Sequence, residues 1–235
     1  LTAEKMTIAL ELLKTHMETP PVDAHFEGDD EKAWVVPDVP GTELDLEATA
    51  SAMNAAALKT TDRTAEAVFK PAYAELSTED AEAMGIKDLL SVRTTIWTGS
   101  SNRQNNVRIT TEYIHQDGRC YLAPGEEFSF HETVGERVPE RGYKPAPGIT
   151  KHGDLKPVYG GGICQVATTL FNSVFFAGLE VTERSNHSIY ISHYPEGRDA
   201  AVAGDEVDLK FINDTDHYIW IKGESSGVRT TFWIY

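Results

Sequence analysis

The sequence predicts an α+β fold, in which an antiparallel sheet packs against an apolar helix and a small mixed α/β domain precedes both. Two observations predict it. Runs of β-branched and aromatic residues separated by turn residues fill the end of the chain, and apolar residues recur at helical spacing after Cys164. Near residue 89 the sequence pattern changes to alternating β-branched residues, and this change divides the chain into two predicted domains, 1–89 and 90–235.

The N-terminal domain is predicted to mix helices with short strands. Apolar residues at helical spacing predict a helix over 2–17 with Thr2 as its N-cap, and an Ala-rich pattern predicts a second helix over 46–58. Ser77 and Asp80 have the spacing of a capping box, which opens a short helix that Gly85 ends. The predicted strands of this domain are 22–26, 33–36 and 68–76.

The C-terminal domain is predicted to be mainly β, with two long helices. One helix is expected over 103–115, and the other runs from Cys164 to a C-terminal cap at Gly178. Residues 131–160 are rich in Pro and Gly, so we expect a long loop that forms a binding surface or lid. The predicted strands of this domain are 91–98, 187–194, 207–213, 218–222 and 228–235.

Composition limits the class of partner. The 235 residues include 37 acidic and 21 basic side chains, for a formal net charge of -16. This charge argues against nucleic acid and against anionic membrane surfaces, because both select basic patches. No apolar run approaches the ~18 residues of a membrane span. Because the chain opens on Leu1, we expect a portion of a longer protein, with membrane attachment only through an N-terminal anchor outside this sequence.

The run Gly160-Gly161-Gly162 ahead of Cys164 is the first candidate for chemistry. Glycines let the backbone turn sharply and free its N–H groups, and a thiol at the positive end of a helix ionises more easily. The N–H groups of Gly161 and Gly162, with the side chain of Gln165, are candidate donors to an oxyanion. The alternative is that Cys164 is a small packing residue, and these residues alone do not decide between the two. The two cysteines of the chain are expected to be free thiols.

A thiolate nucleophile needs a base, and the base needs an orienting group. On the predicted strand 187–194, His187 and His193 are six residues apart and share a face. Asp199 follows a predicted turn and is placed to hydrogen-bond an imidazole. Spacing alone does not separate the two histidines, and each taken singly is more often a surface or structural residue.

Three weaker sets accompany these residues. Cys, His and Asp are acceptable zinc ligands, but the close-set pairs of zinc motifs are absent, so neither a metal nor a cofactor is predicted. Arg184 is a candidate for binding a substrate carboxylate. A role in an exposed salt bridge is an equally good interpretation of this residue. Asn106, in the polar stretch 102–106, is expected to cap a helix or to line a polar groove.

Several motifs follow one another along the second predicted domain. They are Arg103-x-x-Asn106, Pro124-Gly125-Glu126-x-Phe128-Ser129-Phe130, Gly160-Gly161-Gly162-Ile163-Cys164-Gln165-Val166-x-Thr168-Thr169-Leu170, Glu183-Arg184-x-x-His187-Ser188, Gly197-x-Asp199-Ala200 and Phe211-x-Asn213-x-Thr215. In this order, the motifs resemble the VanW domain family over residues 90–235. Residues 20–90 resemble the peptidoglycan-binding domain that often precedes it.

The resemblance implies an enzyme on the extracellular face of the cell envelope. Some clostridial members of the family are similar to L,D-transpeptidases that form 3-3 cross-links in peptidoglycan. By this resemblance, Cys164 attacks a donor stem tetrapeptide, D-alanine leaves, and the amine of an acceptor stem resolves the thioester. His187 would be the base, ahead of His193 on the family pattern, and Asp199 its partner.

Two other functions stay open. One is a non-catalytic peptidoglycan-binding or glycopeptide-resistance accessory module. The other is a cysteine peptidase or amidase on the same polymer, which passes the acyl group to water rather than to an amine.

Overall fold

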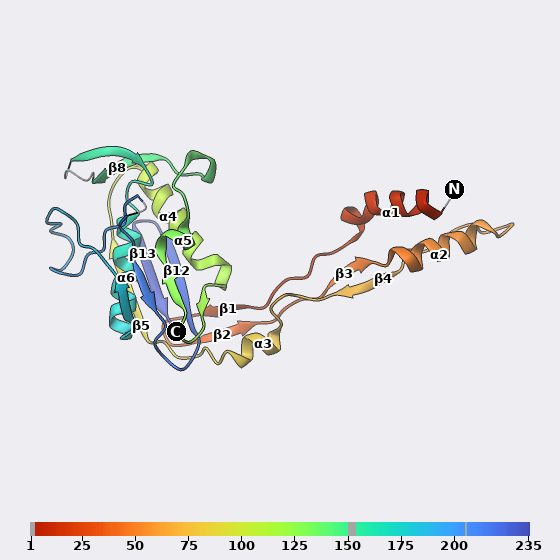
Figure 1. Ribbon diagram of the computed structural model, residues 1–235, viewed down its shortest axis with the longest axis horizontal. Helices are drawn as coiled ribbons and strands as arrows, with labels where there is room; N and C mark the ends of the chain where they lie inside the picture. Colours follow the sequence, from red (N-terminus) through yellow and green to blue (C-terminus); the bar gives the residue numbers. More distant parts are fainter. Residues whose placement is uncertain (1–2, 150–153, 205) are drawn as a thin grey trace. The chain divides into compact units, whose positions relative to one another are not determined.

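The computed structural model describes residues 3–149, 154–204 and 206–235. The chain divides into two compact units (Figure 1). Unit 1 takes in the chain up to His25 together with Val35–Ala83, and unit 2 takes in Phe26–Trp34 and Met84–Tyr235. Both helices and antiparallel sheets are present, which confirms the predicted α+β class. Within the described residues, no helix combines the length and the apolar character needed to cross a membrane.

Unit 1 combines helices with one antiparallel strand pair, β3 with β4. Asp45 caps α2, because its side chain accepts a hydrogen bond of 2.9 Å from the N–H of Ala48. Ser77 accepts from the N–H of Asp80 at 3.0 Å, as the predicted capping box requires. The predicted N-cap Thr2 lies outside the described residues. The elements are α1 (Ala3–Met17), β3 (Gly41–Leu44), α2 (Leu46–Ala57), β4 (Phe69–Ala72) and α3 (Thr78–Ala83).

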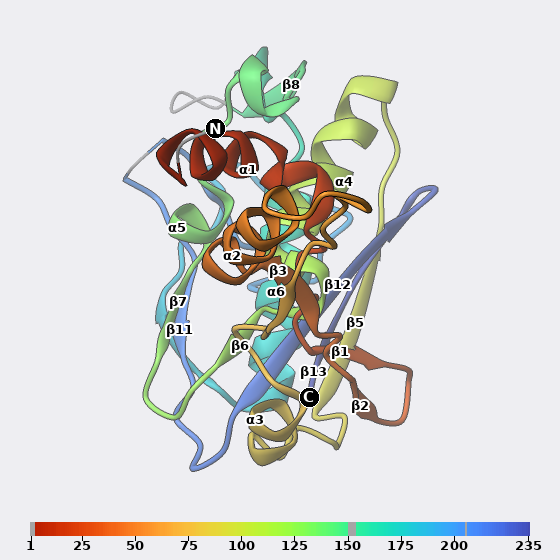
Figure 2. The same cartoon turned by 90° about the vertical axis from the view of Figure 1, so that its right-hand side faces the viewer.

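The main sheet of unit 2 is antiparallel and joins strands from the two ends of the unit. β5 (Ser91–Ile96) pairs with β13 (Arg229–Ile234), which pairs with β12 (Ile219–Ser226), and β6 (Tyr121–Leu122) closes the order. Helices α4 (Ser101–His115) and α6 (Cys164–Ala177) pack on this sheet and on each other. Figure 2 gives a second view of these strands and helices.

The strands β1 (His25–Gly28) and β2 (Ala33–Val36) form a hairpin. Residues of this hairpin contact the face of the main sheet that points away from helices α4 and α6. The indole N–H of Trp233 donates to Asp30 at 2.7 Å, and the ring of Phe26 lies 5.8 Å from that of Trp220. Residues 26–34 therefore belong to unit 2, although they come before the domain boundary that the sequence predicts at residue 89.

Smaller strand pairs complete unit 2. A three-stranded sheet has the order β10 (Glu180–Glu183), β11 (Lys210–Ile212) and β7 (Glu127–Ser129), and helix α5 (Phe130–Val134) follows β7 directly. The segment 131–160, predicted as a loop, contains the hairpin of β8 (Pro145–Ile149) and β9 (Leu155–Tyr159). Short 3-10 turns cover Gln116–Gly118 and Pro139–Arg141.

Helix α6 is the central helix of the core. It begins at Cys164 and ends at Gly178, whose φ of 83° is the left-handed C-cap that the sequence predicts. Its side chains from Gln165 to Val174 are buried. Ser173 also donates to the carbonyl of Phe232 at 2.9 Å, so the helix is tied to β13 as well as packed on it.

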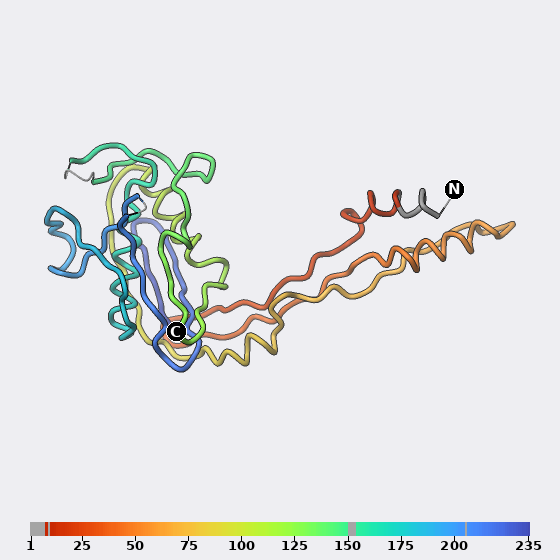
Figure 3. The backbone as a smooth tube through the Cα atoms, in the orientation of Figure 1, coloured from red at the N-terminus to blue at the C-terminus, as the bar shows by residue number. Residues whose placement is uncertain are grey.

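The predicted strand 187–194 is wrong, because this segment is an irregular loop (Figure 3). Its alternating pattern finds no neighbouring strand, and Ile189 is 41% exposed. The backbone N–H of His187 donates to the side chain of Asp199 at 2.8 Å instead of to a strand carbonyl. The side chain of Asp199 therefore accepts the backbone hydrogen bond that a neighbouring strand would accept in a β-sheet.

Candidate functional site

The glycine turn before α6 is shaped by close backbone contacts. Gly160 and Gly162 have φ of 78° and 105°, in the region where L side chains are strained. A Cβ on Gly161 would overlap the carbonyl oxygen of Ala146, so only glycine fits there. The run therefore fixes the position at which Cys164 begins the helix.

Asn106, predicted as a cap or groove residue, supports this turn from within the core. It is fully buried, and its amide donates to the carbonyls of Gly161 at 3.1 Å and Lys144 at 2.8 Å. Its oxygen accepts from the N–H of Lys144 at 2.9 Å. The side chain is therefore committed to holding two backbone segments together, and none of these bonds leads to the cavity.

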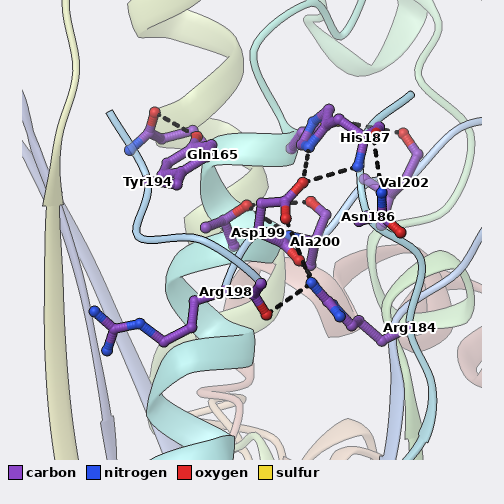
Figure 4. Close-up of polar contacts among 12 residues, drawn as sticks. Gln165, Arg184, Asn186, His187, Tyr194, Arg198, Asp199, Ala200 and Val202 are labelled. Atoms are coloured by element: carbon purple, nitrogen blue, oxygen red, sulfur yellow. Dashed lines mark hydrogen bonds and ion pairs between the residues drawn. The ribbon is translucent and has the colours of Figure 1, made fainter. Parts of the chain in front are cut away.

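His187 and Asp199 form a tight pair. The His187 Nδ1 lies 2.7 Å from Asp199 Oδ2, and the same oxygen accepts the backbone N–H of His187 at 2.8 Å (Figure 4). Burial acts against the charge of Asp199, but these bonds from His187 hold the pKa of the carboxyl below its usual 3.8. The carboxylate therefore fixes both the ring and the backbone of His187.

His187 lines the same cavity as Cys164, and the thiol acts on the titration of the imidazole. Burial acts to lower the pKa of His187, but the hydrogen bond and charge of Cys164, followed by those of Asp199, raise it above its usual 6.5. Since Nδ1 faces Asp199, Nε2 is the nitrogen left for the sulfur. The three residues thus form the Cys–His–Asp arrangement that acyl transfer through a thiolate uses.

Three side chains of α6 hold residues 198–202, the segment that carries Asp199 and is called the strap below. Cys164, Thr168 and Asn172 are spaced by four residues and so share one helix face. Their partners are alternate residues of the strap, which runs antiparallel to the helix. The bonds are Asn172 to the Arg198 carbonyl (2.8 Å), Thr168 to the Ala200 carbonyl (3.2 Å) and N–H (3.0 Å), and Cys164 Sγ to the Val202 carbonyl (3.5 Å).

Arg184 belongs to the support of Asp199. Its Nε donates to the carbonyl of Asp199 at 2.8 Å, and Nη2 lies 3.4 Å from Asp199 Oδ1 and 3.0 Å from the carbonyl of Gly197 (Figure 4). The structure therefore brings Arg184 to the acid of the site and engages its guanidinium there. Its cation also lies over the ring of Phe171.

Gln165 is likewise committed to the protein. It is 1% exposed, its Oε1 accepts from the hydroxyl of Tyr194 at 2.9 Å, and its Nε2 donates to Thr95. It therefore braces the loop against the helix, and its side-chain amide does not face an oxyanion position. His193, the rival base, is exposed beside Tyr194, and its pKa is lowered by burial and then by the charges of Arg103 and His187.

A cavity of about 420 Å³ opens over the sulfur. Cys164 and His187 lie on one side of it, the loop 189–194 on another, and residues of the β8–β9 hairpin on a third. The segment predicted to form a binding surface or lid thus supplies a wall. A second hollow of about 420 Å³ lies against the other side of the loop and is bordered by His187, Asp199 and Arg184.

Cys120 lies away from the candidate site. Cys120 is buried, and burial raises its pKa to about 12, so it stays protonated. Both cysteines are free thiols, as predicted. In the part of the chain that the structure describes, no group of three or more His, Cys, Asp or Glu side chains could hold a metal ion.

Sequence reasoning missed Thr168, Asn172 and Tyr194. The first two could have been found, since the spacing Cys164-x-x-x-Thr168-x-x-x-Asn172 places their polar side chains on the same helix face as the candidate nucleophile. Nothing in the local sequence marks Tyr194, because the residue it contacts, Gln165, is 29 positions away.

The sequence of unit 2 can be compared with known families. The sequence matches the family "VanW like protein" over residues 102–235, more than half of the chain, and the chain belongs to that family. Residues 1–66 match a peptidoglycan-binding domain. The second match supports a role related to the cell wall.

Two curated proteins are similar to this chain. The "Uncharacterized protein YoaR" of Bacillus subtilis (strain 168) is 38% identical over 128 residues, which cover 54% of this chain and 41% of the relative. The "Vancomycin B-type resistance protein VanW" of Enterococcus faecalis (strain ATCC 700802 / V583) is 34% identical over 110 residues, 43% of this chain and 38% of the relative. The matched part spans about two fifths of each relative. No solved structure matches the chain.

Proposed function

We propose that unit 2 is a peptidoglycan L,D-transpeptidase that forms 3-3 cross-links through a thioester on Cys164. The observation that carries the proposal is the position of His187, which lines one cavity together with Cys164 and whose Nδ1 lies 2.7 Å from Asp199. A thiol paired to an oriented imidazole is the requirement for cysteine-dependent acyl transfer.

The first half-reaction breaks a peptide bond. His187 Nε2 takes the proton of the thiol, and the sulfur attacks the carbonyl that joins the third and fourth residues of a donor stem. The tetrahedral intermediate collapses, the imidazolium returns its proton to the departing amine, and D-alanine leaves. The donor stem is then held to Cys164 as a thioester.

The second half-reaction restores the thiol. The side-chain amine of a diamino acid on an acceptor stem attacks the thioester carbonyl, and His187 takes the proton of that amine. The new amide bond forms as the carbon–sulfur bond breaks, and the thiolate leaves with a proton from His187. A carboxylate held beside Nδ1 stabilises the imidazolium in both halves.

The oxyanion needs hydrogen-bond donors, but two of the predicted ones are engaged elsewhere. The side chain of Gln165 is bonded to Thr95 and Tyr194, and the N–H of Gly161 donates to the Val158 carbonyl at 3.0 Å. The first N–H groups of a helix lack intrahelical partners, so the backbone N–H of Cys164 is the donor we assign. The glycine turn supports this assignment, because it holds the first turn of α6 at the edge of the cavity.

The test is incubation of the full chain with disaccharide-tetrapeptide, followed by mass spectrometry. We expect a cross-linked dimer and free D-alanine, and a loss of more than ~10³-fold in the Cys164→Ala protein, because the acyl acceptor is removed. The Cys120→Ala protein is the matched control and should retain dimer formation. Cross-linking that survives in Cys164→Ala would refute the proposal.

The two histidines provide a second matched pair. His187→Gln is expected to lower the rate of cross-linking by roughly 10²–10⁴-fold, the usual contribution of a positioned acid–base group. His193→Gln should change it by less than about threefold, since His193 is exposed and bonded to neither Cys164 nor Asp199 in the described residues. The reverse order of effects would move the role of base to His193.

A second candidate function is a non-catalytic accessory module. It is favoured by the hydrogen bond from the Cys164 thiol to the Val202 carbonyl, which gives the residue a structural role without chemistry, and by the name of the enterococcal relative. The same experiment separates the candidates. An accessory module binds the stem and yields neither D-alanine nor dimer, whereas a hydrolase releases D-alanine and accumulates tripeptide alone.

A further inference from the structure

Arg103 reaches the cavity of Cys164 through a gap left by two glycines. A Cβ on Gly162 would lie 2.8 Å from Arg103 Cγ, and a Cβ on Gly99 would lie 2.7 Å from its Cδ. The two glycines are 63 positions apart in sequence, and neither close approach would tolerate a larger residue without displacement of the arginine. The guanidinium is thus guided to the floor of the cavity, which Arg103 lines together with Cys164 and His187.

The charge of Arg103 is not neutralised by the residues described around it. Its hydrogen bond is a long one, from Nη2 to Gln165 Oε1 at 3.4 Å, and its buried Nε has no partner. Of the ion pairs formed between described residues, none includes Arg103, and the described lining of the cavity contains no Asp or Glu. Arg184, in contrast, is engaged by a carboxylate and two carbonyls.

An unpaired buried donor is costly. A buried N–H without an acceptor loses the hydrogen bond it would make to water, so an unused Nε on a guanidinium that lines a cavity favours an anionic partner there. The Nε–H and a neighbouring Nη–H form one edge of the guanidinium fork. That edge matches the two oxygens of a carboxylate, and bidentate pairs of this kind are the strong ones.

The position of Arg103 relative to Cys164 selects which carboxylate fits. The guanidinium adjoins Gly162 and Gln165, which lie two residues before and one residue after the nucleophile. In the reaction proposed above, the leaving residue is the last of the stem. Its carboxylate therefore follows the attacked carbonyl by about one residue length, roughly 3.3–3.6 Å.

We infer that Arg103 binds the free carboxylate of the residue that leaves, and so restricts the donor to stems that end one residue after the attacked carbonyl. This inference rests on the proposed function and adds to it the residue that determines donor length. A stem with a fifth residue, or one whose terminus is an amide, leaves the guanidinium unpaired and is bound poorly. Arg103 acts on substrate selection and takes no part in the transfer of protons.

Binding tests the inference without any need for turnover. In the full chain carrying Cys164→Ala, calorimetry should show that the tetrapeptide binds at least about tenfold more tightly than its C-terminal amide or the pentapeptide. The amide and the pentapeptide bind more weakly because neither forms the charge-assisted pair with Arg103. In Cys164→Ala/Arg103→Gln, the three ligands should bind equally, to within about twofold. A preference for the free acid that survives Arg103→Gln would overturn the inference, as would equal binding of acid and amide by Cys164→Ala alone.

Two controls separate this inference from the proposed function and from misfolding. Arg108→Gln removes an arginine from the same helix that is exposed and paired with Glu112, and it should leave the preference unchanged. Arg103→Lys keeps the charge without the fork and should retain only part of the preference. If the protein distinguishes acid from amide through Arg103 yet forms no dimer, carboxylate recognition stands and the transpeptidase proposal fails. If dimers form and the acid preference is independent of Arg103, the reverse holds.

Discussion

Helix α6 and the loop 184–202 supply the two halves of the candidate site by different means. The helix brings Cys164 on regular structure, with its side chains from Gln165 to Val174 buried. The loop brings His187 on irregular structure, and Tyr190 near its middle is 71% exposed. The candidate site therefore joins one residue fixed by packing to another fixed by individual hydrogen bonds.

The difference decides what holds each half in place. The start of α6 depends on backbone shape, since Gly161 fits against Ala146 with no room for a side chain. The loop depends on polar side chains of the helix, which bind it at Ala200 through Thr168 and at Tyr194 through Gln165. We therefore expect substitutions in the two halves to separate stability from activity.

Gly161→Ala is expected to have the largest effect on stability. The added methyl overlaps the carbonyl of Ala146, and overpacking of this kind costs about 3 kcal/mol. The measurement is urea unfolding followed by tryptophan fluorescence, because all four tryptophans lie in unit 2. Gly178→Ala is the comparison, because its φ of 83° strains an added side chain while the space around the Cβ is open, and it should cost only about 1–2 kcal/mol. Equal losses would show that the glycine turn is not limited by the contact with Ala146.

Thr168→Val is expected to act mainly on the loop. It removes both bonds to Ala200 while keeping the shape of the side chain, and should cost about 1–3 kcal/mol. Because the strap positions Asp199, we expect the rate of cross-linking to fall by more than the loss of stability alone explains. Thr182→Val, which removes an exposed bond to Glu127, is the control. A variant with lowered stability and an unchanged rate would break the link between strap and site.

The smallest expected effect is the dependence of stability on pH through the His187–Asp199 pair. The pKa of His187 is raised on folding, so its contribution is full below about pH 6.5 and is lost as the pH rises through the folded value. The pKa of Asp199 is lowered, so its contribution is present above about pH 3.8 and is lost at more acid pH. The free energy of unfolding of the wild type minus that of His187→Gln should therefore shrink as the pH rises above about 6.5. A difference that grows with pH would contradict the raised pKa.

The helical half of the site could be predicted because its information is local. The recurrence of apolar residues from Cys164, the glycines before it and Gly178 after it all agree, and each acts within a few residues. The strand predicted over 187–194 failed for the opposite reason. Its alternation was real, but an acceptor 12 residues away, Asp199, took the N–H that a strand partner would need.

The sequence by itself determined the α+β class, the helix that begins at Cys164, the glycine turn before it and the residue types that chemistry requires. Only the tertiary structure decided that the side-chain hydrogen bonds of Arg184, Gln165 and Asn106 go to other parts of the protein, and that Arg103 reaches the cavity. Helices and turns are fixed by neighbours in sequence. The partners of a polar side chain are fixed by whichever distant donors and acceptors the packed core brings within about 3 Å.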